Sequence, residues 1–133
     1  MLARRLALLA LLPFLLLLMA LRDAPLVDPD PLAIPPKVGN EQVAKAVKLA
    51  LAHRGWIVIE EKPGEIASTL HLRDHTARIP ISWDKAQIHI RYVDSVNLKY
   101  HVEDGKPYIH KNYLDWVNNL IADISGNLAM VSM

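Results

Sequence analysis

The sequence predicts an α+β domain built as a helix, a four-stranded antiparallel meander and a second helix, with both helices on one face of the sheet. Two observations carry this prediction. Apolar residues recur at helical spacing in two segments, 40–54 and 113–128, and they alternate with polar residues in the stretch between them. The connections within that stretch are short, which favours antiparallel pairing of neighbouring strands.

The two helices are predicted from their apolar faces and from the residues at their ends. Asn40 can cap the first helix, Glu41 suits its first turn, and Gly55 can end it in a left-handed conformation. The apolar face of this helix consists of Val43, Ala46, Val47, Ala50 and Leu51. The second helix has a longer stripe: Tyr113, Trp116, Val117, Leu120, Ile121, Ile124 and Leu128. Burial of such side chains contributes ~1.5–3 kcal/mol each, so we expect this helix to dock on the sheet.

Four strands are predicted between the helices. The first two cover residues 56–62 and 65–73, and the third and fourth cover 77–83 and 87–92. Pro80 has no backbone N–H, which indicates a sheet edge or a bulge near the middle of the third strand. Residues 93–108 are predicted to form a loop or a short irregular strand.

The N-terminal 22 residues have the pattern of an export signal or a membrane anchor. Arg4 and Arg5 precede 16 uncharged residues, 6–21, and Arg22 follows them. As a helix this run is ~24 Å long, somewhat short of a ~30 Å hydrocarbon core, so a cleaved signal and a retained anchor both stay open. Cleavage after Ala20 would leave leucine where a small residue is preferred, and we therefore favour a retained anchor with the C-terminal domain outside.

Three regions follow from this pattern: residues 1–22 as signal peptide or anchor, 23–39 as a proline-rich linker, and 40–133 as the folded domain. The linker carries five prolines and little hydrophobic periodicity. Such a segment favours extended, polyproline-like geometry and is predicted to hold the domain away from the bilayer.

Composition excludes several classes of function. The net charge of +1, from 15 Lys and Arg against 14 Asp and Glu, offers no basic excess for binding nucleic acid. The chain has no cysteine, which excludes thiolate catalysis, Cys-ligated zinc, disulfides and a lipid-modified N-terminal cysteine. The six histidines lack the spacing of a metal site, so no metal or other cofactor is predicted.

From Asn40 onward the chain resembles a family of small uncharacterised Gram-negative envelope proteins, many of them predicted lipoproteins. The resemblance rests on several blocks in one order: 53–56, 63–66, 70–73, 94–95 with 97–100, and 109–113 with 116–120. It implies export and a compact α+β domain, and it brings no activity, ligand or catalytic residue. This chain lacks the cysteine that would be lipidated, so a tether would have to come from the hydrophobic segment itself.

Two surfaces are candidates for binding. The first is a basic strip on the sheet face opposite the helices, where like charges on neighbouring strands suggest a bound anion or an acidic partner; it consists of His71, Arg73, Arg78, His89 and Arg91. The alternative interpretation of this strip is a solvated face that keeps sheet edges from aggregating.

The second candidate is a polar and aromatic surface between the last strand and the last helix: Asp94, Ser95, Asn97, Tyr100, His110, Asn112 and Tyr113. These residues could equally satisfy backbone groups and pack tyrosine rings.

The sequence therefore predicts an exported protein of the periplasm or cell envelope, tethered to the inner membrane through residues 6–21 or, after cleavage, soluble in the periplasm. We expect a non-catalytic binding or accessory domain that contacts an envelope protein or an anionic envelope component. Two alternatives stay open. One is a small hydrolase or metal-dependent enzyme that uses His, Asp and Ser of residues 94–113, and the other is a purely structural spacer.

Overall fold

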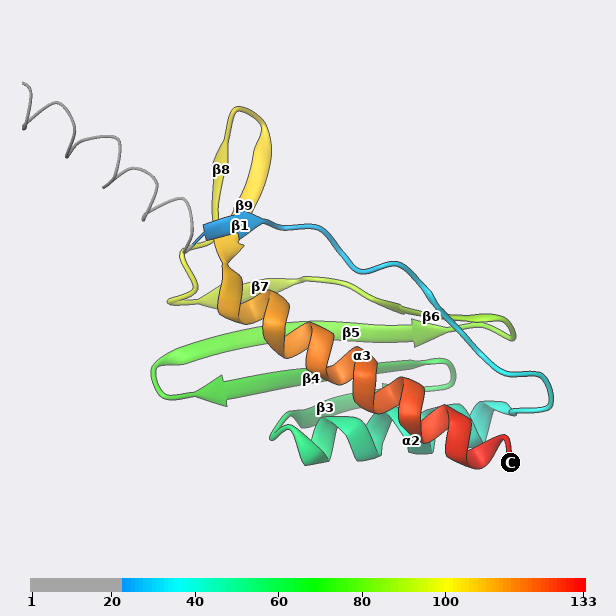
Figure 1. Cartoon of the computed structure of the whole chain (residues 1–133). Coiled ribbons are helices and arrows are strands. Elements are labelled where there is room, and N and C mark those ends of the chain that lie inside the picture. Colours follow the sequence, from blue (N-terminus) through cyan, green and yellow to red (C-terminus); the bar gives the residue numbers. More distant parts are fainter. Residues whose placement is uncertain (1–22) are drawn as a thin grey trace, which may run out of the picture.

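The computed structural model describes residues 23–133, which form two helices and nine strands in two antiparallel sheets (Figure 1). The strands are β1 (Asp23–Pro25), β2 (Leu32–Ala33), β3 (Ile57–Lys62), β4 (Glu65–Leu72), β5 (His75–Trp83), β6 (Gln87–Ile90), β7 (Asp94–Val96), β8 (His101–Glu103) and β9 (Lys106–His110). The predicted fold, a four-stranded meander between two helices, is wrong. The four expected strands, β3 to β6, belong to a six-stranded sheet that also contains β2 and β7, and a second sheet has the order β1-β9-β8.

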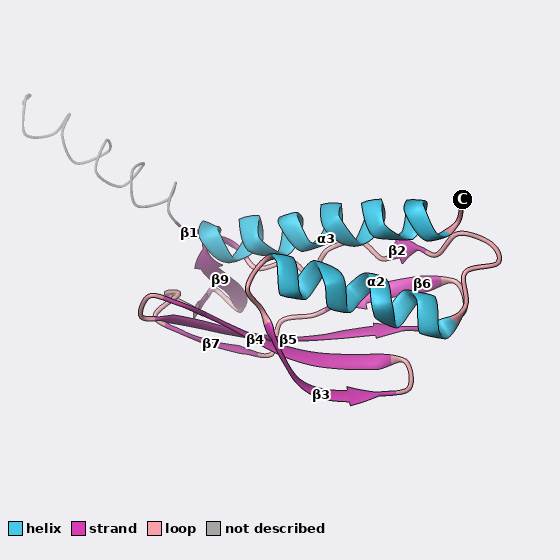
Figure 2. Ribbon diagram, turned by 90° about the horizontal axis from the view of Figure 1, so that it is seen from below, coloured by secondary structure: helices cyan, strands magenta, loops and turns pink. Residues whose placement is uncertain are grey.

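The helices are α2 (Asn40–His53) and α3 (Lys111–Val131), and both lie on one face of the larger sheet (Figure 2). Gly39, not Asn40, precedes the first turn of α2, and its N–H donates to the Gln42 side chain at 2.9 Å. The Asn40 side chain instead accepts a hydrogen bond from the indole N–H of Trp83 at 2.7 Å. Within residues 23–133, neither helix combines the length and the apolar character that crossing a membrane requires. The predicted anchor, 1–22, lies outside the described residues.

The hydrophobic core fills the space between the helices and the larger sheet. Alternation along β5 turns Ala77, Ile79 and Ile81 toward the helices, where all three are buried. The helices contribute the buried side chains of the predicted stripes, including Val47 on α2 and Leu120 on α3. The opposite face of the sheet has no helix over it among the described residues (Figure 2).

Pro80 marks an interruption along one edge of β5. The first part of β5 pairs with β7 and the last part with β6, and Pro80 lies between the two paired stretches. On this side the Pro80 carbonyl still accepts a hydrogen bond from the N–H of Arg91 at 3.2 Å. The N–H of Tyr92 donates instead to the Asp28 carboxylate at 3.0 Å, so residues 91–93 separate β6 from β7. The missing proline donor thus coincides with the break between two short strands.

The proline-rich segment 23–39, expected to be a spacer, lies along the folded domain. It contributes β1, which pairs with β9, and β2, which pairs with β6. Ile34 is buried, and its N–H donates to the Ala86 carbonyl at 2.8 Å. Between the two strands, Asp28 accepts the hydrogen bond from Tyr92. The prolines therefore keep this segment extended while it is bound to the domain instead of separating the domain from residues 1–22.

The smaller sheet closes one end of the molecule. Its hairpin, β8–β9, turns at Asp104 and Gly105, which both have positive φ (52° and 75°), as the tight turns of twisted hairpins require. β9 leads directly into α3, so the first turn of α3 lies beside β1 (Figure 1).

Candidate functional site

The sheet face away from the helices is the first predicted candidate surface, and the strand register defines which residues lie on it. Cross-strand rows on this face run through Lys62, Glu65, Ser82 and His89, through Glu60, Ala67 and Pro80, through Ile57, Thr69, Arg78 and Asp94, and through His71, Thr76 and Val96. We call these residues the open face. On β4, β5 and β6 these side chains alternate with buried neighbours, and the register places the residues of β3 and β7 beside them.

Arg78 lies in the middle of the open face and has a carboxylate partner. Asp94 stands directly opposite it on β7, and the two side chains form an ion pair at 2.9 Å. The sequence predicts a loop at Asp94, because a strand of three residues is too short to show alternation. The like-charge repulsion that suggested a bound anion is therefore already relieved at Arg78.

The other residues of the predicted basic strip are not brought together into one cluster. Arg73 lies in the turn between β4 and β5 with φ of 58°, and Arg91 lies between β6 and β7. His71 is on the open face, where its imidazole lies 3.2 Å from the Thr76 hydroxyl. His89 is also on it, opposite Ser82. Glu60, Glu65 and Asp94 share this face, so its charge is mixed and not uniformly basic.

The predicted polar and aromatic surface, 94–113, is largely engaged in contacts within the domain. Tyr92 stacks on Tyr100 with ring centroids 5.1 Å apart and meets Tyr113 edge-on at 5.5 Å. The Tyr92 hydroxyl lies 2.8 Å from the Ser95 hydroxyl. Burial raises the pKa of Tyr92, and the deeper burial of Tyr113 raises the pKa of that phenol further. Tyr100 keeps 46% of its surface exposed.

Asn97 and His110 hold backbone segments in place. Asn97 has φ of 59°, and its side-chain amide donates to the Asp74 carbonyl at 2.9 Å. His110 precedes α3, and its Nδ1 accepts from the N–H of Asn112 at 3.1 Å. Each side chain thus satisfies a backbone group near a turn or a helix end, as polar residues in such positions commonly do.

An enzyme site in this region would need its histidine, aspartate and serine to converge. Asp94 pairs with Arg78, Ser95 with Tyr92, and His110 with the first turn of α3. No hydrogen bond among residues 23–133 joins Asp94, Ser95 and His110 to one another. Across the same residues, no group of three or more His, Asp or Glu side chains is arranged to hold a metal ion.

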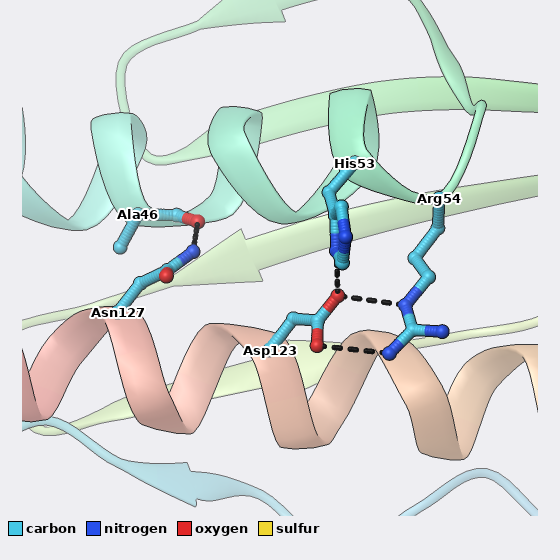
Figure 3. Close-up of polar contacts among 5 residues, drawn as sticks. All are labelled: Ala46, His53, Arg54, Asp123 and Asn127. Atoms are coloured by element: carbon cyan, nitrogen blue, oxygen red, sulfur yellow. Dashed lines mark hydrogen bonds and ion pairs between the residues drawn. The ribbon is translucent and has the colours of Figure 1, made fainter.

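A polar cluster that no sequence pattern indicates joins the two helices (Figure 3). Asp123 of α3 receives two hydrogen bonds from Arg54, at 2.7 and 3.1 Å, and its carboxylate lies 2.9 Å from the His53 imidazole. One turn further along, the Asn127 amide donates to the Ala46 carbonyl of α2 at 3.0 Å. These contacts connect residues 69 to 81 positions apart, so only the antiparallel packing of α2 and α3 brings them together.

Removal of the Asp123 carboxylate is expected to weaken the protein mainly above pH ~4. The hydrogen bonds from Arg54 and His53 hold the pKa of Asp123 well below its usual range. A carboxyl group with a lowered folded-state pKa stabilises the fold above its unfolded pKa of ~3.9, and the effect is lost as pH falls through the folded pKa. Asp123→Asn should therefore lower the urea midpoint at neutral pH, with a difference from wild type that shrinks in acid.

The matched control is Asp115→Asn, an exposed aspartate on the same helix with no ion pair among the described residues. Its urea midpoint should follow the wild type at every pH. An Asp123→Asn midpoint that differs from wild type by the same amount at neutral pH and in acid would contradict the role given to the carboxylate.

A hollow of about 670 Å³ lies at the end of the molecule where α2 begins. It is lined by Val38, Gly39, Asn40, Val43, Pro63, Gly64, Trp83, Asp84 and Lys85. No sequence pattern indicates this hollow, because its walls come from the start of α2 and from two sheet turns that are distant in the sequence. Trp83 lines this hollow, and its indole N–H already donates a hydrogen bond to the Asn40 side chain.

The comparisons with known proteins do not assign this chain to a family. No protein-family model, no curated protein and no solved structure matches it. The resemblance to Gram-negative envelope proteins therefore stays a prediction from the sequence.

Proposed function

We propose that this chain is a non-catalytic binding domain of the cell envelope, retained at a membrane by residues 1–22, that holds a protein partner on the open face. The observation that carries the proposal is the uncovered face of the six-stranded sheet (Figure 2). Both helices lie on the other face, so this surface is free to meet a partner without rearrangement of the core.

The composition of the open face supports a protein partner. Val96 follows Asp94 by two residues on β7 and is 50% exposed, and Ile57, 57% exposed, lies in the same cross-strand row as Arg78 with Thr69 between them. Apolar side chains beside an arginine, with polar groups around them, are typical of the centre and rim of a protein interface. A partner would remove this apolar surface from water.

Charge favours a protein over an anionic polymer. Arg78 already has Asp94 as its counter-ion, and Glu60 and Glu65 on the same face repel polyanions. A protein surface with charges of both signs can complement such a face, whereas a phosphate-rich chain cannot.

The placement in the envelope is supported by the N-terminal sequence. Arg4 and Arg5, the uncharged run 6–21 and the absence of cysteine fit an exported chain that is held by its own hydrophobic segment.

Photo-crosslinking in the native envelope tests the proposal. A p-benzoylphenylalanine residue at Val96 of the full-length chain should yield an adduct from which peptides of a second protein are recovered. Arg78→Ala should lower the yield of that adduct about tenfold, which corresponds to the loss of ~1.4 kcal/mol at an interface hot spot.

The control position is Leu49, which is 54% exposed on α2 and lies on the helix side of the sheet. It should give no adduct with the same protein. Equal adducts from Val96 and Leu49, or an adduct at Val96 that Arg78→Ala leaves unchanged, would count against the open face as the binding surface.

A further inference from the structure

The folded domain begins almost immediately after the hydrophobic run. The last residue of that run is Leu21, and Asp23 is already the first residue of β1, where it pairs with His110. Only Arg22 separates the two. Because one residue spans at most ~3.6 Å, the Cα atoms of Leu21 and Asp23 lie at most about 7 Å apart.

This length is comparable with the thickness of one layer of lipid headgroups. The hydrocarbon core is ~30 Å thick and the whole bilayer ~40–45 Å, which leaves roughly 5–8 Å for the polar layer on each side. If residues 6–21 occupy the hydrocarbon core, the Asp23–His110 pair has to lie within or at the edge of that layer. The proline-rich segment cannot add distance, because it follows Asp23 and lies along the domain.

The residues around this pair suit a headgroup environment. Lys111 is exposed and directly follows His110, and the His110 N–H donates to the Leu98 carbonyl at 2.8 Å, which places Lys99 and Tyr100 nearby. Lysine binds lipid phosphate while its stem stays in apolar surroundings, and tyrosine is enriched at the membrane interface. Asp23, which is half-buried, is the acidic residue of the small sheet at this end, and Glu103 and Asp104 lie at the hairpin turn, at the other end of β9 from His110.

We propose that the end of the domain formed by β1, residues 98–100 and the first turn of α3 rests directly on phospholipid headgroups, with Lys99 and Lys111 against lipid phosphate. The inference rests on the proposed retention of residues 1–22. α3 then leads away from the membrane, whereas the β8–β9 hairpin leaves the same end of the domain on the other side of His110 from α3 (Figure 1). A protein partner would have to reach the open face beside a membrane surface.

Depth-dependent fluorescence quenching tests this placement on the full-length chain. The chain has no cysteine, so Lys111→Cys and Ser132→Cys each give one labelling site, at opposite ends of α3. Each variant is labelled with an environment-sensitive fluorophore and reconstituted in vesicles of phosphatidylethanolamine and phosphatidylglycerol that carry a nitroxide on the headgroup. Quenching at residue 111 should exceed quenching at residue 132 at least about threefold, because ~30 Å of helix separates the two sites.

A matched variant with about 20 Gly and Ser residues inserted between Arg22 and Asp23 provides the control, since such a linker has an r.m.s. length of ~25 Å. It should lower the quenching at residue 111 to the level at residue 132. Equal quenching at both sites without the linker, or unchanged quenching at residue 111 with it, overturns the placement. N-terminal sequencing of the envelope protein tests retention separately: a start between residues 20 and 30 would refute the anchor, whatever the vesicles show.

Discussion

Ile34→Ala is expected to lower the free energy of unfolding by about 2–4 kcal/mol, the cost of removing most of a buried isoleucine side chain. Ile34 belongs to the proline-rich segment, yet only 9% of its surface is exposed and its N–H donates to the Ala86 carbonyl. Urea unfolding followed by tryptophan fluorescence measures the change. A free spacer would contribute nothing to this quantity, so the experiment separates a bound segment from an unbound one.

Val27→Ala is the matched control for Ile34→Ala. Val27 lies in the same segment and is 70% exposed. Its truncation should change the free energy of unfolding by no more than about 0.5 kcal/mol. If the two variants lose equal stability, residues 23–39 do not pack against the domain in solution as they do here.

Leu98→Ala is expected to have an effect of similar or larger size, about 2–5 kcal/mol. Leu98 is 1% exposed, although it lies in the connection between β7 and β8. Its neighbours Asn97 and Lys99 both have positive φ, at 59° and 57°, and such backbone costs about 1–3 kcal/mol per residue. Burial of Leu98, together with the hydrogen bond from the His110 N–H to its carbonyl, offsets that strain.

The measurement for Leu98→Ala is again urea unfolding, with amide hydrogen exchange of residues 97–101 as a local readout. Both stability and local protection should fall. Val96→Ala, two residues earlier and 50% exposed, should change the unfolding free energy by less than about 0.5 kcal/mol. Wild-type protection of residues 97–101 in Leu98→Ala would show that the strained backbone holds its conformation without the leucine.

The elements with long periodic patterns could be predicted from the sequence. The apolar stripes of α2 and α3 are read directly from their spacing, because burial of one helix face requires it. The strands β4 and β5 are long enough to show alternation. The sequence pattern predicts the start of α3 too late, because the helix begins at Lys111 and has no apolar residue before Tyr113.

The short strands could not be predicted, because their conformation is set by distant partners. β1, β2, β7 and β8 have two or three residues each, too few for any period to appear. β1 and β2 also contain or adjoin prolines, which suggest a linker when the pairing strand is unknown. Local propensity is a weak guide wherever tertiary pairing decides the outcome.

The same limitation explains the misplaced charges of the candidate surface. Once β7 is assigned to a loop, Arg78 appears to lack a partner, and the basic strip follows from that error. His53, Arg54 and Asp123 were not linked in the sequence, because nothing local relates the end of one helix to the middle of another. Pro80 predicted a sheet edge or a bulge, but β5 is paired on both sides and keeps its register with β4 through Pro80, and the missing donor coincides instead with the break between β6 and β7.

The pairing of β1 with β9 also sets an order of events during synthesis. Asp23 and His110 are 87 positions apart, so β1 leaves the ribosome long before its partner exists. At a synthesis rate of roughly 5–20 residues per second, β1 is without its partner strand β9 for about 4–17 seconds. Only when the β8–β9 hairpin has been made can the beginning of the domain close against its end, so a chain truncated before residue 106 has no partner for β1.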